Sequence, residues 1–71
     1  MWVNAEKRLP KKPGMYRVLR RGIGNRGEYE DAAELRRVEY VNGLDDKVVY
    51  WNWYNNRGVR ITTVESWWQD E

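Results

Sequence analysis

Residues 47–54 read Lys-Val-Val-Tyr-Trp-Asn-Trp-Tyr and carry the strongest indication of the fold class. Valine and the aromatic residues favour extended backbone, because their side chains pack well on a pleated surface. Apolar side chains occupy both alternating sets of positions, so both faces of this segment are suited to burial. We therefore predict a β-strand over residues 47–54, in the middle of a sheet.

Clusters of turn-forming residues divide the rest of the chain at even spacing. They lie at residues 10–14, 22–27, 42–46 and 55–58. The Gly, Pro, Asn and Asp residues in these clusters either fix the backbone angle φ or tolerate positive values of it. The segments between them are rich in Val, Tyr, Trp, Ile and Thr, which predicts further strands at Met15–Arg21, Ala33–Val41 and Val59–Val64. Since short connections join the segments, we expect an antiparallel meander.

Three segments leave alternatives open. Asp31 could cap a helix with Glu34 in its first turn, but the Val-Glu-Tyr-Val sequence that follows favours a strand, which we prefer. The arm before Pro10 predicts a short turn or 3₁₀ segment, with Trp2 packed against the body. Residues 66–71 suit a last strand or a helical turn. The predicted fold is mainly β, with a small α+β fold as the alternative: a single antiparallel meander sheet of four to five strands with at most one short helix.

Length and composition exclude several classes of protein. A chain of 71 residues forms one small domain, residues 1–71. The absence of Cys excludes disulfides, thiolate nucleophiles and the usual structural zinc sites, and the absence of His excludes an imidazole base. Five Trp and five Tyr supply large apolar side chains for a small core. We predict no catalytic residue, no metal and no cofactor, and therefore a protein that is not an enzyme.

Two patterns invite a catalytic or ligand-binding interpretation and do not support it. Residues 22–27 match the dinucleotide pattern G-x-G-x-x-G, but that chemistry needs a helix after the third glycine. Acidic residues follow instead, and the chain is too short for a doubly wound sheet. Acidic residues also cluster at 28–34 and 45–46, where they could hold a metal or serve hydrolysis. Both clusters flank predicted turns, where solvated carboxylates are ordinary.

The basic residues are unevenly distributed and carry the functional hypotheses. Residues 1–27 hold eight Lys and Arg against one acidic residue, whereas residues 28–71 hold five against ten. Basic side chains near aromatic strand residues suit a protein–protein contact, our first hypothesis, or a single-stranded nucleic acid, our second. A small carboxylate-dependent enzyme is a weaker third hypothesis. The candidate partner-binding residues are Lys11, Lys12, Arg17, Arg20, Arg21, Arg26, Trp53 and Tyr54.

Tryptophan content and edge strands add two expectations. Five Trp exceed what so small a core requires, so Trp53 or the Trp67-Trp68 pair should be partly exposed. An exposed edge strand would also allow a homodimer, with a monomer as the alternative.

Landmark segments stand at both ends of the chain. They are Trp2-Val3, Arg8-Leu9-Pro10, Gly14-Met15-Tyr16-Arg17-Val18 and the closing Ile61-Thr62-Thr63-Val64-Glu65-Ser66-Trp67. In this order they resemble a family of short phage and prophage proteins of unknown function. The family usually has a His where Ser66 stands and a Pro-rich tail, which this chain lacks. The resemblance implies a small β-rich fold of phage or prophage origin and carries over no functional residue. Small proteins of that origin often block one host protein, such as the target of an anti-CRISPR protein.

The N-terminal sequence bears on location. Residues 1–7 contain no apolar segment typical of a signal peptide, and no long apolar run follows. We expect a cytoplasmic protein with no membrane association, in the host bacterium if the origin is a phage.

Overall fold

The computed structural model describes residues 1–24 and 27–70. Every regular element in these residues is a β-strand. The strands are β1 (Trp2–Asn4), β2 (Gly14–Arg21), β3 (Glu28–Val41), β4 (Lys47–Tyr54), β5 (Arg60–Ile61) and β6 (Val64–Trp68). They form one antiparallel sheet, which confirms the mainly β prediction.

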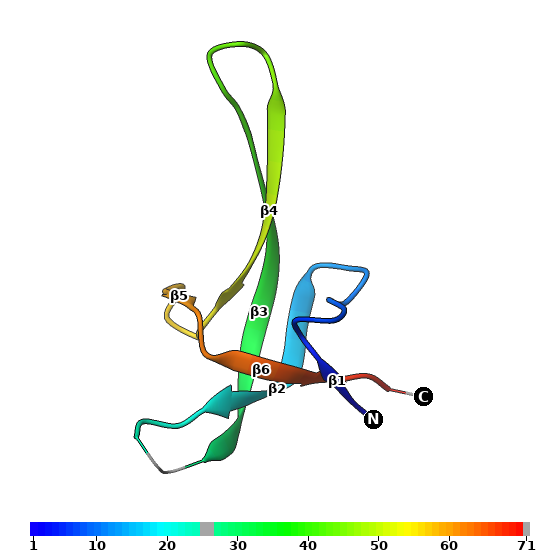
Figure 1. The fold of residues 1–71 in the computed structure, drawn as a ribbon, viewed down its shortest axis with the longest axis vertical. Coiled ribbons are helices and arrows are strands. Elements are labelled where there is room, and N and C mark those ends of the chain that lie inside the picture. The colour runs from blue at the N-terminus through cyan, green and yellow to red at the C-terminus, as the bar shows by residue number, and fades with distance from the viewer. Residues whose placement is uncertain (25–26, 71) are drawn as a thin grey trace.

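The strand order is β1-β6-β2-β3-β4-β5, so the sheet is a meander only from β2 to β5. After β5 the chain returns to the far side of β2, where β6 pairs with it, and β1 then pairs with β6. Figure 1 shows β6 crossing the lower half of β3 and β1 lying beside the two chain ends. The prediction of four to five strands is corrected to six, because the two chain ends pair with each other.

The predicted and the observed limits of a strand agree best where strand-forming residues are concentrated between two turn sequences. The predicted strand over residues 47–54 coincides with β4. Residues 31–37 belong to β3, which starts at Glu28, so the strand alternative was the right one. The predicted strand Val59–Val64 is wrong as a single element, because Thr62 and Thr63 separate β5 from β6.

The core lies on one face of the sheet. Its buried residues are Val3, Val18, Ala33, Leu35, Trp53 and Trp67. Cross-strand pairing of Leu35 with Trp53, and of Val18 with Trp67, places these side chains on the same face, because directly paired residues point the same way. The arm between β1 and β2 covers part of this face through Ala5 and Leu9.

The upper half of the β3–β4 hairpin projects beyond this core (Figure 1). The molecule is 44 Å long, and its radius of gyration is 13.6 Å. A compact domain of this length would have a radius of about 11 Å. The expectation that residues 47–54 lie in the middle of the sheet holds only at their C-terminal end. There β4 lies between β3 and β5, which pairs only with Trp53 and Tyr54, and Trp51 and Trp53 reach the core.

Candidate functional site

A cleft opens beside β2 because its neighbour β6 departs from it. The two strands pair only from Val18 to Arg20. Beyond Trp68 the chain turns toward its own beginning, and the backbone N–H of Gln69 donates a hydrogen bond of 2.9 Å to the carbonyl of Met1. Residues 14–17 of β2 therefore have β3 on one side and a wedge-shaped opening on the other.

This opening comprises two adjoining hollows that share Tyr16, Trp67 and Gln69, and we call them together the Tyr16–Trp67 cleft. The first hollow has a volume of about 490 Å³ and the second about 310 Å³. The first is lined by Met15, Tyr16, Arg17, Trp67, Trp68, Gln69 and Asp70. The second is lined by Arg8, Leu9, Pro10, Lys11, Lys12, Tyr16, Trp67 and Gln69.

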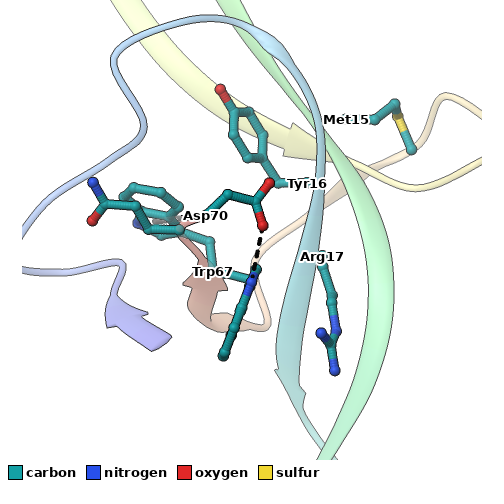
Figure 2. Close-up of a pocket in the computed structure, with 7 residues that line it drawn as sticks. Met15, Tyr16, Arg17, Trp67 and Asp70 are labelled. Atoms are coloured by element: carbon teal, nitrogen blue, oxygen red, sulfur yellow. Dashed lines mark hydrogen bonds between the residues drawn. The ribbon is translucent and has the colours of Figure 1, made fainter. Parts of the chain in front are cut away.

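Alternation along β2 arranges the first hollow. Figure 2 shows Tyr16 on one side of the strand, and Met15 and Arg17 on the other. Trp67 and Asp70 enter from the C-terminal segment. The carboxylate of Asp70 accepts a hydrogen bond of 3.1 Å from the indole Nε1 of Trp68, the dashed contact in the figure.

Two side-chain hydrogen bonds hold the arm against the second hollow. The indole Nε1 of Trp67 donates to the carbonyl of Arg8 at 2.8 Å, and the hydroxyl of Tyr16 donates to the carbonyl of Lys12 at 2.7 Å. The ring of Tyr16 also meets Trp67 and Trp53 edge to face, with ring centres 5.9 and 6.1 Å apart. These contacts make the base of the cleft a packed aromatic cluster, which limits movement of the arm.

Positive charge surrounds the cleft. Arg8, Lys11, Lys12 and Arg17 line it, and Asp70 is the acidic group among its described lining residues. The guanidinium of Arg8 donates to the side-chain oxygen of Gln69 at 2.6 Å and lies 6.0 Å from the ring centre of Trp67. A cleft of this charge favours anionic ligands, because Lys and Arg side chains bind carboxylates and phosphates.

Arg17 stands at the far rim of the cleft. It forms an ion pair with Glu30 of β3, and its guanidinium carbon lies 5.5 Å from the ring centre of Trp2 and 5.1 Å from that of Trp68. The edge-to-face pair of these two indoles, with centres 5.2 Å apart, thus supports the guanidinium.

The candidate residues predicted from the sequence do not form one basic patch. Lys11 and Lys12 line the second hollow of the cleft, and Arg17 lines the first. Arg21 forms an ion pair of 3.8 Å with Glu65 instead, and Arg26 lies outside the described residues.

Arg20 belongs to a structural network on the core face of the sheet. Its guanidinium donates to the Asp31 carboxylate at 2.9 Å and to the Thr63 hydroxyl at 3.0 Å. The Arg20 hydrogen bond, aided by the backbone N–H of Ala32, holds the pKa of the Asp31 carboxyl below its usual value. Arg20 is thus committed to neighbouring strands and does not reach the cleft.

The two aromatic candidates also lie away from the cleft rim. Trp53 is a core residue with 8% of its surface exposed, so the expectation that it is partly exposed is wrong, and its contact with a partner stays a prediction. Trp67 is buried too, whereas Trp68 is half-buried. Tyr54 lies half-buried beneath the guanidinium of Arg36, whose carbon is 4.4 Å from the ring centre.

Most residues that line the cleft were not among the predicted candidates, and three of these contribute the arm contacts and the aromatic base: Arg8, Tyr16 and Trp67. All three belong to the landmark segments at the two ends of the chain. Aromatic and basic residues recur in the landmark segments at both ends of the chain, and this recurrence was the available signal for the cleft. Its interpretation required the knowledge that the two chain ends lie side by side in the fold.

The remaining motifs adopt simple strand and turn structures. Glycine 27 is followed directly by β3, not by the helix that dinucleotide binding needs. In the described part of the chain, no group of three or more Asp or Glu side chains is arranged to hold a metal ion. Over the same residues, no helix is long and apolar enough to cross a membrane.

Comparisons of the chain with protein-family models, with curated proteins and with solved structures find no significant match. The resemblance to phage and prophage proteins therefore stays a prediction.

Proposed function

We propose that the protein is a non-enzymatic binding module that holds an acidic, extended segment of a partner protein in the Tyr16–Trp67 cleft. The observation that carries this proposal is the coincidence of four cationic side chains with an uncovered stretch of strand edge in β2. An extended segment could add to that edge through main-chain hydrogen bonds, while Lys11 and Lys12 pair with its carboxylates. The resemblance at the chain termini adds a host or defence protein as the source of the segment.

The aromatic geometry favours a protein segment over a single-stranded nucleic acid. Binders of single strands present flat ring faces on which bases stack. Here Trp67 has 5% of its surface exposed, and Tyr16 is held edge to face between Trp53 and Trp67. Arg20 and Arg21, which the nucleic-acid hypothesis would use, are paired with Asp31 and Glu65.

Peptide titration tests the proposal. A fluorescein-labelled peptide of alternating Glu and Val would be titrated with the protein and followed by anisotropy, with a Lys-Val peptide of equal length as the control. We expect the acidic peptide alone to bind, and the Lys11→Glu/Lys12→Glu variant to weaken binding about tenfold or more. The charge-matched variant Lys7→Glu/Arg57→Glu, outside the cleft lining, should change it less than about threefold.

A second titration with poly-dT at about 50 mM and about 200 mM salt distinguishes the alternative. Binding of poly-dT that weakens steeply with salt and quenches Trp fluorescence would instead establish a nucleic-acid binder. Failure of the acidic peptide to bind at the lower salt concentration would overturn the proposal.

A further inference from the structure

The outer half of the β3–β4 hairpin is a two-stranded ribbon that no third strand flanks, and Trp51 at its base packs against the core. Residues 36–41 of β3 and 47–52 of β4 pair with one another, whereas β2 accompanies β3 only to Leu35 and β5 accompanies β4 only at Trp53 and Tyr54. Figure 1 shows this ribbon extending away from every other strand. A two-stranded ribbon is marginally stable in water, since it has no third element against which to bury apolar area.

Apolar side chains are exposed on both faces of the ribbon. On one face Tyr40 and Tyr50 are 54% and 46% exposed, with ring centres 5.4 Å apart. On the other face Val41 and Val49 are 56% and 39% exposed. Exposed aromatic and β-branched residues on an isolated ribbon are typical of a strand that pairs with another chain.

Hydrogen bonding at the two ends of β4 shows which backbone groups are free. The N–H of Asn42 donates to the carbonyl of Asp46, and the N–H of Asn55 donates to the carbonyl of Val59. Because hydrogen-bonded pairs alternate along antiparallel strands, every second residue of β4 directs its N–H and C=O groups away from β3. In the ribbon these residues are Lys47, Val49 and Trp51. On the side of β4 that faces away from β3, no described strand pairs with them.

The two long edges of the ribbon differ in how far charged side chains protect them from pairing with another strand. Along the β3 edge, Arg36 pairs with Glu34 at 2.7 Å, and Arg37 pairs with Glu39 at 2.8 Å. Charged side chains of this kind discourage another strand from pairing. The β4 edge runs Val-Val-Tyr-Trp-Asn after Lys47 and carries that one charge. The β4 edge is therefore the one suited to strand addition.

We infer that two copies of this chain form a dimer by pairing β4 with β4 in antiparallel orientation, about a two-fold axis at Val49. A two-fold axis perpendicular to the sheet keeps each side chain on its own face of the sheet. The odd-numbered residues of β4 therefore pair with odd-numbered residues of the second copy. Centring on Val49 sets Lys47 opposite Trp51 of the second copy. This register uses the outward N–H and C=O groups of all three residues.

A shift of the axis to Tyr50 is less favourable. Lys47 would then lie opposite Trp53 of the second copy, whose outward backbone groups already pair with Ile61 of β5. The outward groups of Lys47 would remain unused, and an unpaired backbone group covered by another chain is costly. The preference for Val49 thus follows from the end of the β4–β5 pairing.

Side chains and charges are complementary in the Val49 register. The side chain of Lys47 is 70% exposed, and its ammonium group forms an ion pair of 3.4 Å with Glu39. In the dimer this group would also face the indole of Trp51 of the second copy, a favourable cation–π pairing. Val48 would lie opposite Tyr50 on the other face, a cross-strand pair typical of stable sheets. The acidic tip with Asp45 and Asp46 would approach β5 of the second copy, on which Arg60 is exposed.

Sedimentation equilibrium of the full chain tests the dimer. We expect the mass to rise from 8.6 kDa toward twice that value as concentration increases to about 1 mM. Val49→Lys, which places a charge on the pairing edge, should raise the dimer dissociation constant about tenfold or more. Val41→Lys is the matched control, on the same face of the ribbon but at its β3 edge, and should change the constant less than about threefold. A chain that stays monomeric throughout, or equal effects of both substitutions, would overturn the inference.

Cysteine cross-linking tests the register independently, because the chain has no Cys. Paired residues at a two-fold axis have Cα atoms about 4.5–5.5 Å apart, within the range a disulfide spans. Val49→Cys should therefore form a cross-linked dimer under mild oxidation, much faster than Leu44→Cys at the ribbon tip. Equal rates for the two variants would overturn the register. None of these outcomes bears on the Tyr16–Trp67 cleft, whose ligand is tested by peptide binding.

Discussion

The indole of Trp67 donates a hydrogen bond of 2.8 Å to the backbone carbonyl of Arg8, joining residues 59 positions apart in the chain. This contact ties the N-terminal arm to β6 and closes one wall of the cleft. Core packing and the shape of the cleft are thus coupled at one buried side chain, since Trp67 contributes to both.

Removing this hydrogen bond should destabilise the protein. Trp67→Phe keeps an aromatic ring but leaves the Arg8 carbonyl without its indole donor, which we expect to lower the free energy of unfolding by about 1–3 kcal/mol. Trp68→Phe is the matched control, because its indole donates to the exposed Asp70 carboxylate, and it should lower that free energy by less than about 1 kcal/mol. Urea denaturation followed by circular dichroism measures both; equal losses would contradict the assigned role of Trp67.

Truncation of Leu35 should bring the domain close to unfolding. Leu35 is fully buried between β2 and β4, and replacement of such a residue by Ala typically costs about 2–5 kcal/mol. A domain of this length has a total stability of only about 4–10 kcal/mol. Leu44→Ala is the control at an 83% exposed position on the ribbon tip, where we expect a change within about 0.5 kcal/mol. Thermal denaturation of the two variants distinguishes core from surface; a small loss in Leu35→Ala would show that the core lies elsewhere.

The turn before β5 should require glycine at position 58. Gly58 has a φ angle of +77°, which an L side chain adopts only with strain. Gly58→Ala should therefore destabilise the protein by about 1 kcal/mol or more. At Gly43 the φ angle is not in that region, and a methyl group would meet nothing within 4 Å. Gly43→Ala should be neutral or stabilising by about 0.4–1 kcal/mol, through the lower entropy of the unfolded chain. Chemical denaturation midpoints of both variants test the contrast, which the reverse order would refute.

Acid should lower the free energy of unfolding, partly because the Asp31 carboxylate becomes protonated. Its pKa is lowered in the folded protein, chiefly by the Arg20 hydrogen bond, from an ordinary value of 3.8. A carboxyl group of this kind contributes stability above its unfolded pKa and loses that contribution as pH falls through the folded pKa. The loss should therefore begin near pH 4 and grow below it. Asp31→Asn should reduce the decline in urea midpoint between about pH 5 and pH 3, relative to the wild type.

The control for this experiment is Asp46→Asn, at an exposed position on the ribbon tip. We expect its urea midpoint to follow the wild-type decline with pH. A decline in Asp31→Asn as steep as that of the wild type would show that the Arg20–Asp31 pair is not the source of the acid sensitivity.

Strands rich in Val, Tyr and Trp and bounded by turn sequences could be predicted from the sequence alone. The limits of β4 were predicted correctly, because Val, Tyr and Trp favour extended backbone and Asn-Gly and Asn-Asn sequences end it on either side. The β assignment of residues 31–37 was also correct, since the apolar residues that follow continue the strand. Each of these features depends on neighbours a few residues apart, which a sequence pattern records directly.

The pairing of distant strands and the burial of individual side chains followed from the folded chain as a whole. The return of β6 to β2 joins residues 8–17 to residues 67–70 and so creates the cleft, whereas Arg20 and Arg21 lie outside its lining and pair with Asp31 and Glu65. In β4, Trp53 lies in the core, whereas Val49 and Tyr50 are exposed, because β2 and β5 end before reaching this part of the hairpin. Alternation specifies two faces, but burial depends on distant segments whose positions follow from the free energy of packing the whole chain.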